Sequence, residues 1–221
     1  MTVLFVVGTI VFFLIADAVV RKFRGEAYLP ALQPAKPSYH PVRVPEGIFF
    51  AKSHTWVNLF PSGKVRVGID DFVERLLENP TIIFTKRRGD SVKKGDPLML
   101  LKSDQRTLTI RSPLEGNIID VNDDLPKNPA SMQSDLFGDG WGYVIKPTHA
   151  SQLKEFFLGD EARTWIKDEF RRLRELLANI GKSGAGNLAL MQDGGLPASG
   201  VLNKLDDSVC ALVEQAFLEV Q

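Results

Sequence analysis

Apolar side chains follow three patterns along the chain, and each pattern predicts a different kind of element. An unbroken apolar run occupies Thr2–Val20, in which Asp17 is the only ionisable side chain. Alternating apolar and polar positions, as in Lys64–Ile69, recur in the central part and predict half-buried strands. Apolar residues return at helical spacing after residue 150. The chain is therefore expected to contain an apolar anchor, a β-rich domain and terminal helices.

The central region, residues 48–145, has the pattern of short strands joined by tight turns. Between the strands, Asp71 and Glu74 offer a capping pair for one short helix that ends before Pro80. Glycines at the corners favour a sandwich or a flattened barrel. The expected strands are 48–50, 56–59, 64–69, 81–85, 97–101, 107–110 and 117–121.

Residues 151–180 are expected to form one or two helices, broken near Gly159, with Asp160 as a candidate cap for the second. The second helix carries a narrow apolar seam amid many charges. Two heptads are too few for an independent coiled coil, so the seam either packs on the β domain or pairs with another protein. The seam consists of Ile166, Phe170, Leu173, Leu177 and Ile180.

The remaining chain divides into a glycine-rich linker, residues 181–202, and an amphipathic helix, residues 203–221. An amphipathic helix behind a flexible linker either docks on its own domain or enters a partner's groove. The predicted apolar face of this helix contains Leu205, Val209, Leu212, Val213 and Ala216.

The apolar run Thr2–Val20 is long enough for a transmembrane helix, placed at residues 1–22, because it would span about 28 Å. Positive charges follow it at Arg21, Lys22 and Arg24. The positive-inside rule then predicts a single-pass protein of the cell membrane whose soluble domain faces the cytoplasm. A cleaved signal peptide is the alternative, although its positive charge would precede the apolar run. Residues 23–47 contain five prolines and predict a semi-stiff spacer.

Composition narrows the classes of function. Lysine plus arginine equals aspartate plus glutamate, 27 against 27, which disfavours nucleic acid as a partner. The single Cys210 excludes an intramolecular disulfide, and His40, His54 and His149 have no metal-ligand spacing. No nucleophile is paired with a base in the sequence. We therefore expect no catalytic residues, no metal site and no enzymatic activity.

Two glycine motifs lie within the central region: residues 89–95 read Gly-Asp-Ser-Val-Lys-Lys-Gly, and residues 112–116 read Ser-Pro-Leu-Glu-Gly. Together they resemble the lipoyl-carrying hairpin of the glycine cleavage system H protein family. The family has Gly-Asp-x-Val-x-x-Gly and Ser-Pro-x-x-Gly at these places, with Glu-Ser-Val-Lys between them. The resemblance implies that the lipoyl-bearing lysine corresponds to Gln105, whether one counts from Gly89 or back from Ser112.

Further motifs extend the resemblance over roughly residues 51–177. Ser53–Val57 is similar to the family's Ser-His-Glu-Trp-Val, and Val67–Phe72 is similar to Val-Gly-Ile-Thr-Asp-Tyr. Asp135–Trp141 is similar to Asp-Pro-Tyr-Gly-Glu-Gly-Trp. The resemblance implies a mainly β fold of the barrel-sandwich hybrid type with appended α-helices, in addition to the predicted transmembrane helix.

The departures from the family pattern fall on its chemistry. The lysine position holds Gln105, the acidic residue three positions before it is replaced by Lys102, and the acidic residue of the Ser-His-Glu-Trp segment is replaced by Thr55. A primary amide cannot be acylated as a lysine amine can. Lys102 is a displaced candidate for lipoylation, but side-chain alternation places it on the opposite face of the strand, about 10 Å from the tip.

Three hypotheses of function follow from these observations. The first is a membrane-anchored, non-lipoylated H-like protein that serves as a docking or assembly module and binds no cofactor. The second is a lipoyl carrier modified at an atypical lysine such as Lys102, and the third is a membrane-fusion-type transport adaptor. For the first, the unknown protein partner would bind the Gln105 hairpin, the Ile166–Ile180 helix or the C-terminal helix, while the N-terminal helix binds the membrane.

Overall fold

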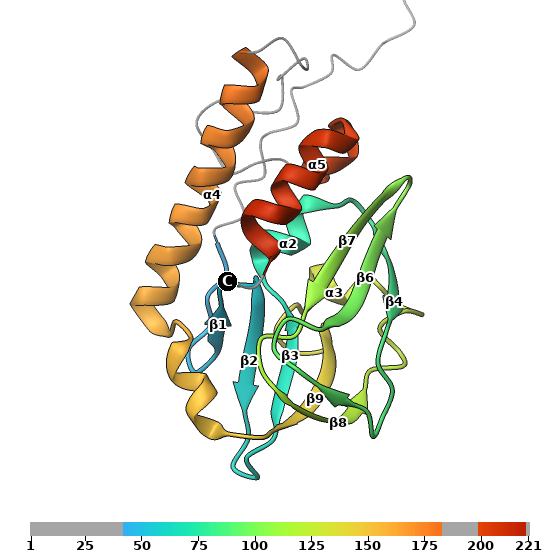
Figure 1. The fold of residues 1–221 in the computed structure, drawn as a ribbon, viewed down its shortest axis with the longest axis vertical. Coiled ribbons are helices and arrows are strands. Elements are labelled where there is room, and N and C mark those ends of the chain that lie inside the picture. Colours follow the sequence, from blue (N-terminus) through green and yellow to red (C-terminus); the bar gives the residue numbers. More distant parts are fainter. Residues whose placement is uncertain (1–41, 183–198, 220–221) are drawn as a thin grey trace, which may run out of the picture. The chain divides into compact units, whose positions relative to one another are not determined.

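Two antiparallel sheets form the centre of the part of the chain that the structure describes, residues 42–182 and 199–219 (Figure 1). This structure is a computed structural model. One sheet has the strand order β1-β2-β3-β9-β8-β5 and the other β4-β6-β7, which confirms the predicted mainly β fold. The strands are β1 (Phe49–Ala51), β2 (Thr55–Leu59), β3 (Val65–Ile69), β4 (Thr81–Phe84), β5 (Ser91–Val92), β6 (Pro97–Ser103), β7 (Arg106–Arg111), β8 (Gly116–Val121) and β9 (Trp141–Pro147).

The glycines of the family motifs stand at sheet corners. Gly95 has a φ of 88°, a left-handed conformation that glycine adopts without strain, and it turns the chain from β5 into β6. Gly116 opens β8 close to β9, where an added Cβ would lie 2.8 Å from Ile145 Cγ2. The pattern missed β5, which is only two residues long, and β9, which follows a loop-like segment rich in glycine and aspartate.

The predicted short helix is α2 (Asp71–Leu76), but its cap differs from the expected one. Asp70 is the N-cap, and its Oδ1 accepts hydrogen bonds from the backbone N–H groups of Phe72 and Val73 at 3.0 and 3.1 Å. The expected capping residue, Asp71, instead accepts from Arg43 Nε at 2.6 Å and Arg75 Nε at 3.1 Å. Asp71 and Glu74 fit the capping-box pattern, but the helix already begins at Asp71, so the preceding Asp70 takes the N-cap position.

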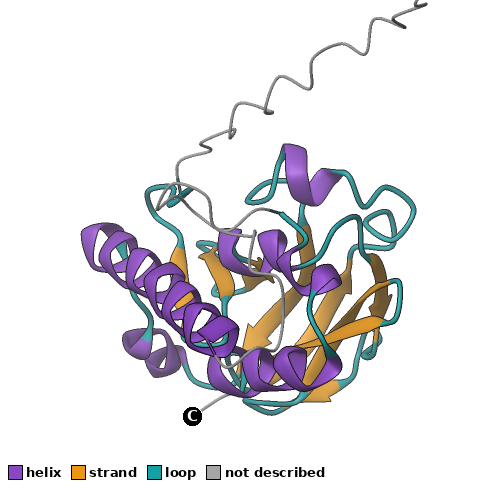
Figure 2. Cartoon of the chain, turned by 90° about the horizontal axis from the view of Figure 1, so that it is seen from above, coloured by secondary structure: helices purple, strands orange, loops and turns teal. Residues whose placement is uncertain are grey.

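The long helix α4 (Gly159–Lys182) runs along one side of the strands (Figures 1 and 2). A 3₁₀ helix, η1 (Ala150–Glu155), precedes it, so the expected break near Gly159 is confirmed. Asp160 lies in the first turn of α4, where its carboxylate pairs with Arg163 at 2.7 Å. The seam residues from Ile166 to Leu177 are buried in the main core, and Ile180 packs against it. The seam therefore packs on its own domain. One further short helix is α3 (Ser131–Ser134).

The C-terminal segment also docks on its own domain, but as three short pieces. They are η2 (Val201–Lys204), α5 (Asp207–Val213) and the π-helical η3 (Glu214–Leu218). The predicted apolar face was partly wrong, because Leu212 is 47% exposed and Ala216 is exposed. The π-helical turn shifts the helix phase, so Phe217 and Leu218 are buried instead. We refer to residues 199–219 as the strap.

The predicted membrane span Thr2–Val20 lies outside the described residues, as does most of the predicted spacer. The helices within residues 42–182 and 199–219 include none with the length and apolar character that a membrane span requires.

Candidate functional site: the Gln105 hairpin and the His54 cluster

Strands β6 and β7 form a hairpin whose turn consists of Asp104 and Gln105. The register closes with Ser103 opposite Arg106, so these two residues alone connect the strands. Asp104 has a φ of 52°, which an aspartate tolerates at tight hairpin turns. Gln105 is exposed at the tip. Gln105 thus occupies the exposed tip of a two-residue turn.

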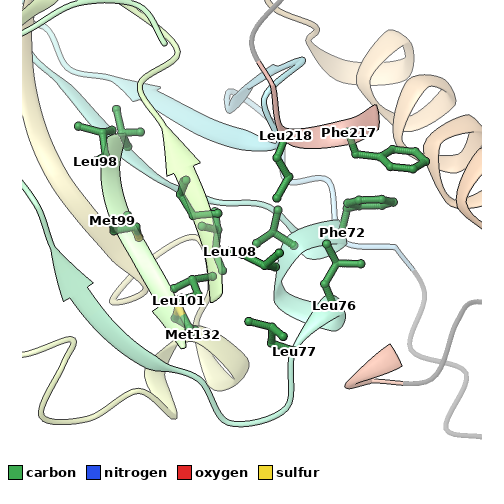
Figure 3. Close-up of a cluster of buried hydrophobic side chains, with 14 of the residues drawn as sticks. Phe72, Leu76, Leu77, Leu98, Met99, Leu101, Leu108, Met132, Phe217 and Leu218 are labelled. Carbon is green, nitrogen blue, oxygen red and sulfur yellow. The ribbon is translucent and has the colours of Figure 1, made fainter. Parts of the chain in front are cut away.

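The two faces of this hairpin have different environments. Met99, Leu101, Leu108 and Ile110 are buried in the core, and Figure 3 shows the first three in the same cluster as residues of α2 and the strap. Lys102 and Thr107 are exposed and lie opposite each other on the outer face. Lys102 also pairs in register with Thr81 of β4, so it lies within the three-stranded sheet and not at the turn.

The third departure from the family pattern, Thr55, lies in the other sheet. It is fully buried on β2, and its hydroxyl is 3.1 Å from Ser53 Oγ. The Thr55 hydroxyl thus has a hydrogen-bond partner inside the protein, and this position carries no charge. The structure therefore unites Gln105 and Lys102 in one hairpin and assigns Thr55 a packing role in β2.

A buried cluster around His54 was not found from the sequence. His54 Nδ1 is 2.8 Å from Asp70 Oδ2, and Nε2 is 3.7 Å from Glu169 Oε2, beyond hydrogen-bonding distance. The imidazole stacks on Phe72 at 4.0 Å between ring centroids, and on Trp165 at 4.9 Å. Three segments far apart in sequence, the β1–β2 turn, the start of α2 and α4, meet at this ring.

The cluster is held together by charge. Burial opposes the positive form of His54, but the carboxylates of Asp70 and Glu169 outweigh it and raise the pKa of His54 above 6.5. Burial alone would raise the pKa of Glu169, but His54 and Arg172 lower it below 4.5. Arg172 is 2.6 Å from Glu169 Oε1. The arrangement is a buried ion network that braces α4 and α2, with no nucleophile in it.

The remaining candidates for chemistry have structural explanations. Burial raises the pKa of the Cys210 thiol, which favours the protonated and less nucleophilic form, and its Sγ is 3.5 Å from Leu202 O. An open pocket is lined by residues that include Ser53, Lys94 and Glu155, and none of its lining residues belongs to the β6–β7 hairpin. Within the described ranges, no group of three metal-ligating side chains could hold an ion.

The similarity of this chain to known proteins covers the residues that form both sheets. The family model for the glycine cleavage H-protein matches residues 48–169, which contain both sheets and the Gln105 hairpin. The glycine cleavage system H protein of Stenotrophomonas maltophilia (strain R551-3) is 30% identical over 126 residues, which cover 57% of this chain and 96% of that protein. That of Coprothermobacter proteolyticus is 30% identical over 125 residues, covering 57% and 98%. A crystal structure of a glycine cleavage system H protein from Mycobacterium marinum is 25% identical, with a TM-score of 0.47, and the match covers 53% of this chain and 94% of that one.

Proposed function

Because this chain belongs to the glycine cleavage H-protein family, we propose that it is a non-catalytic, non-lipoylated member that acts as a docking or assembly module. It is anchored to the membrane by its N-terminal apolar segment, with the soluble domain facing the cytoplasm. Its partners are other proteins of the glycine cleavage system or the enzymes that serve them. The observation that carries this proposal is the exposed Gln105 in a two-residue turn.

The residue at the tip does not fit a lipoyl group. Lipoylation forms an amide with a lysine amine, and the carboxamide of Gln105 offers no such nucleophile. Lys102 has an amine, but its register with Thr81 and Thr107 keeps its backbone inside the sheet, away from the turn. The same hairpin argues against the transport-adaptor alternative, because two turn residues leave no room for a long helical insertion.

We expect the full chain to keep its unmodified mass when it is produced in a host that lipoylates an authentic H protein. Intact-mass spectrometry of both proteins, expressed under the same conditions, makes the comparison. A gain of one lipoyl group on this chain would contradict the proposal and support the carrier alternative. Lys102→Arg then identifies the modified position, since only a carrier using Lys102 would lose the added mass.

Docking at the hairpin tip is tested separately by photo-crosslinking. A photoreactive residue at Gln105 of the membrane-anchored chain is expected to crosslink to a glycine cleavage protein or a lipoylating enzyme. The matched control carries the same residue at Ser62, an exposed position in the β2–β3 turn. Equal crosslinking at both positions, or none at Gln105 in the presence of these candidate partners, would contradict docking through this hairpin.

A further inference from the structure

The strap, residues 199–219, holds the hairpin at its turn. Asn203 is the centre of this contact: its Nδ2 donates to Ser103 Oγ at 2.7 Å and to Asp104 Oδ2 at 3.1 Å. Its Oδ1 accepts from the backbone N–H of Glu78 at 3.0 Å. Beside it, Gly200 N–H donates to Arg75 O at 2.9 Å. One asparagine thus joins the segment after α2 to the turn that presents Gln105.

The strap then follows β7 away from the turn. Arg106 is the first residue of β7. Its guanidinium donates a hydrogen bond to Leu205 O and forms an ion pair with the Asp207 carboxylate. Further along, Glu214 Oε1 accepts a hydrogen bond from the backbone N–H of Thr109 at 3.1 Å. Apolar side chains also fix the strap: Val209 and Val213 are buried between these contacts, and Phe217 and Leu218 are buried after Glu214.

The hydrogen bond to Glu214 shows to which side of β7 the backbone N–H of Thr109 points. β7 is one of the two edge strands in the order β4-β6-β7, so one side of it has no neighbouring strand. The Thr109 N–H points to that side, since it donates to the strap and not to β6. An edge strand with free amides is a template for pairing with another chain. The Glu214 carboxylate occupies the place that a carbonyl of an added strand would take.

We propose that the strap is an autoinhibitory cover that prevents β7 from pairing antiparallel with β7 of a second copy of this chain. Around a twofold axis at Thr109, that residue pairs with its own copy, and Thr107 lies opposite Arg111. The register places no two arginines opposite each other, and Thr107, Thr109 and Ile110 are β-branched residues suited to a strand. The strap lies beyond residue 169, where the family match ends.

The proposal is tested on the full chain in mild detergent with the double variant Asn203→Ala/Glu214→Ala. It removes the side-chain hydrogen bonds of Asn203 and Glu214 and leaves the contacts of Arg106 and the apolar anchors of the strap in place. We expect the Thr109 amide to exchange with solvent at least about tenfold faster than in the wild type, while amides of the β2–β3 hairpin are unchanged. Light scattering is expected to show a concentration-dependent dimer that the wild type does not form. Gln215→Ala, at the exposed neighbour of Glu214, is the matched control and should behave as the wild type.

Thr109→Pro, added to the double variant, decides whether the dimer uses β7. Proline removes the outward N–H and leaves the hydrogen bonds to β6, so the dimer should disappear while the fold remains. A dimer that survives this change would overturn the proposal. So would a protein that stays monomeric although Thr109 exchanges faster. If the double variant leaves Thr109 protected, Val213→Asp releases the strap by placing a charge among its buried anchors, and the same outcomes apply. Rapid exchange of Thr109 in the wild type would show that the edge is uncovered and would also overturn the proposal.

Discussion

Replacing Asp70 with alanine is expected to lower the free energy of unfolding by about 3–5 kcal/mol. The carboxylate serves two partners at once: Oδ2 bonds His54 Nδ1 at 2.8 Å, and Oδ1 caps α2 through two backbone N–H groups. Alanine leaves a buried imidazole without its closest acceptor and leaves the first turn of α2 uncapped. Urea or guanidinium unfolding measures the loss. A decrease below about 1 kcal/mol would mean that only the cap contributes.

The matched substitution Asp70→Asn separates charge from shape. Its amide oxygen can still accept the N–H groups of Phe72 and Val73, so the cap is largely kept while the charge beside His54 is lost. We therefore expect Asp70→Asn to lower the free energy of unfolding, but by less than Asp70→Ala does. The substitutions His54→Gln and Asp70→Asn should combine less than additively, because each removes the same ion pair.

The pH dependence of unfolding reports the same ion pair. The pKa of His54 is higher in the folded than in the unfolded protein, so its contribution is complete below about pH 6.5 and is lost as the pH rises through the folded-state pKa. The pKa of Glu169 is lowered, so its contribution is present above about pH 4.5 and is lost as the pH falls through the folded-state value. His54→Gln should remove the decrease in the free energy of unfolding that occurs as the pH rises through the folded-state pKa of His54. His149→Gln, at an exposed histidine, should retain it.

The strands that the sequence predicted are those with a clear local pattern. Alternation marks Lys64–Ile69, and the structure has β3 at Val65–Ile69. Strand β9 carries a weaker pattern, because Gly142 contributes no side chain and both Val144 and Ile145 are apolar. Its identity as a strand comes from its neighbours, since it pairs with β3 on one side and β8 on the other. Such pairing joins segments far apart in the chain and leaves little trace in local periodicity.

In the candidate site, too, the features with a local sequence signal could be predicted, and those that depend on long-range packing could not. The resemblance to the family placed Gln105 at the tip of the hairpin, because the two glycine motifs that carry it lie on either side of this residue and close to it in the sequence. The His54 cluster could not be located in this way, since its members stand at positions 54, 70 and 169 and meet only through the packing of α4. The motifs Ser53–Val57 and Val67–Phe72 carried the available signal, which was that His54 and Asp70 both lie within stretches similar to the family.

The contacts of the strap also explain why its helical periodicity was misleading. A regular helix through residues 203–221 places Leu212 and Ala216 on the apolar face, but the π-helical η3 inserts an extra residue into the turn. That change brings Phe217 next to Phe72, and Figure 3 shows the two rings as neighbours. Their ring centroids are 5.2 Å apart. The irregular shape follows the surface of α2 and β7. A seven-residue helix such as α5 is too short to persist alone, so its structure depends on docking.

Phe217→Ala is accordingly expected to destabilise the protein by about 3–5 kcal/mol, the usual range for a buried phenylalanine. Phe217 is only 4% exposed, its ring contacts Phe72, and Arg172 Cζ lies 5.0 Å from the ring centroid. Chemical unfolding measures the change, and Leu212→Ala, at a side chain 47% exposed on the same segment, should alter stability by less than about 0.5 kcal/mol. A loss below about 1 kcal/mol for Phe217→Ala would show that the strap unfolds independently of the sheets. If the strap shares the core, as the burial of Phe217 against α2 requires, hydrogen exchange of α2 should rise together with that of the strap.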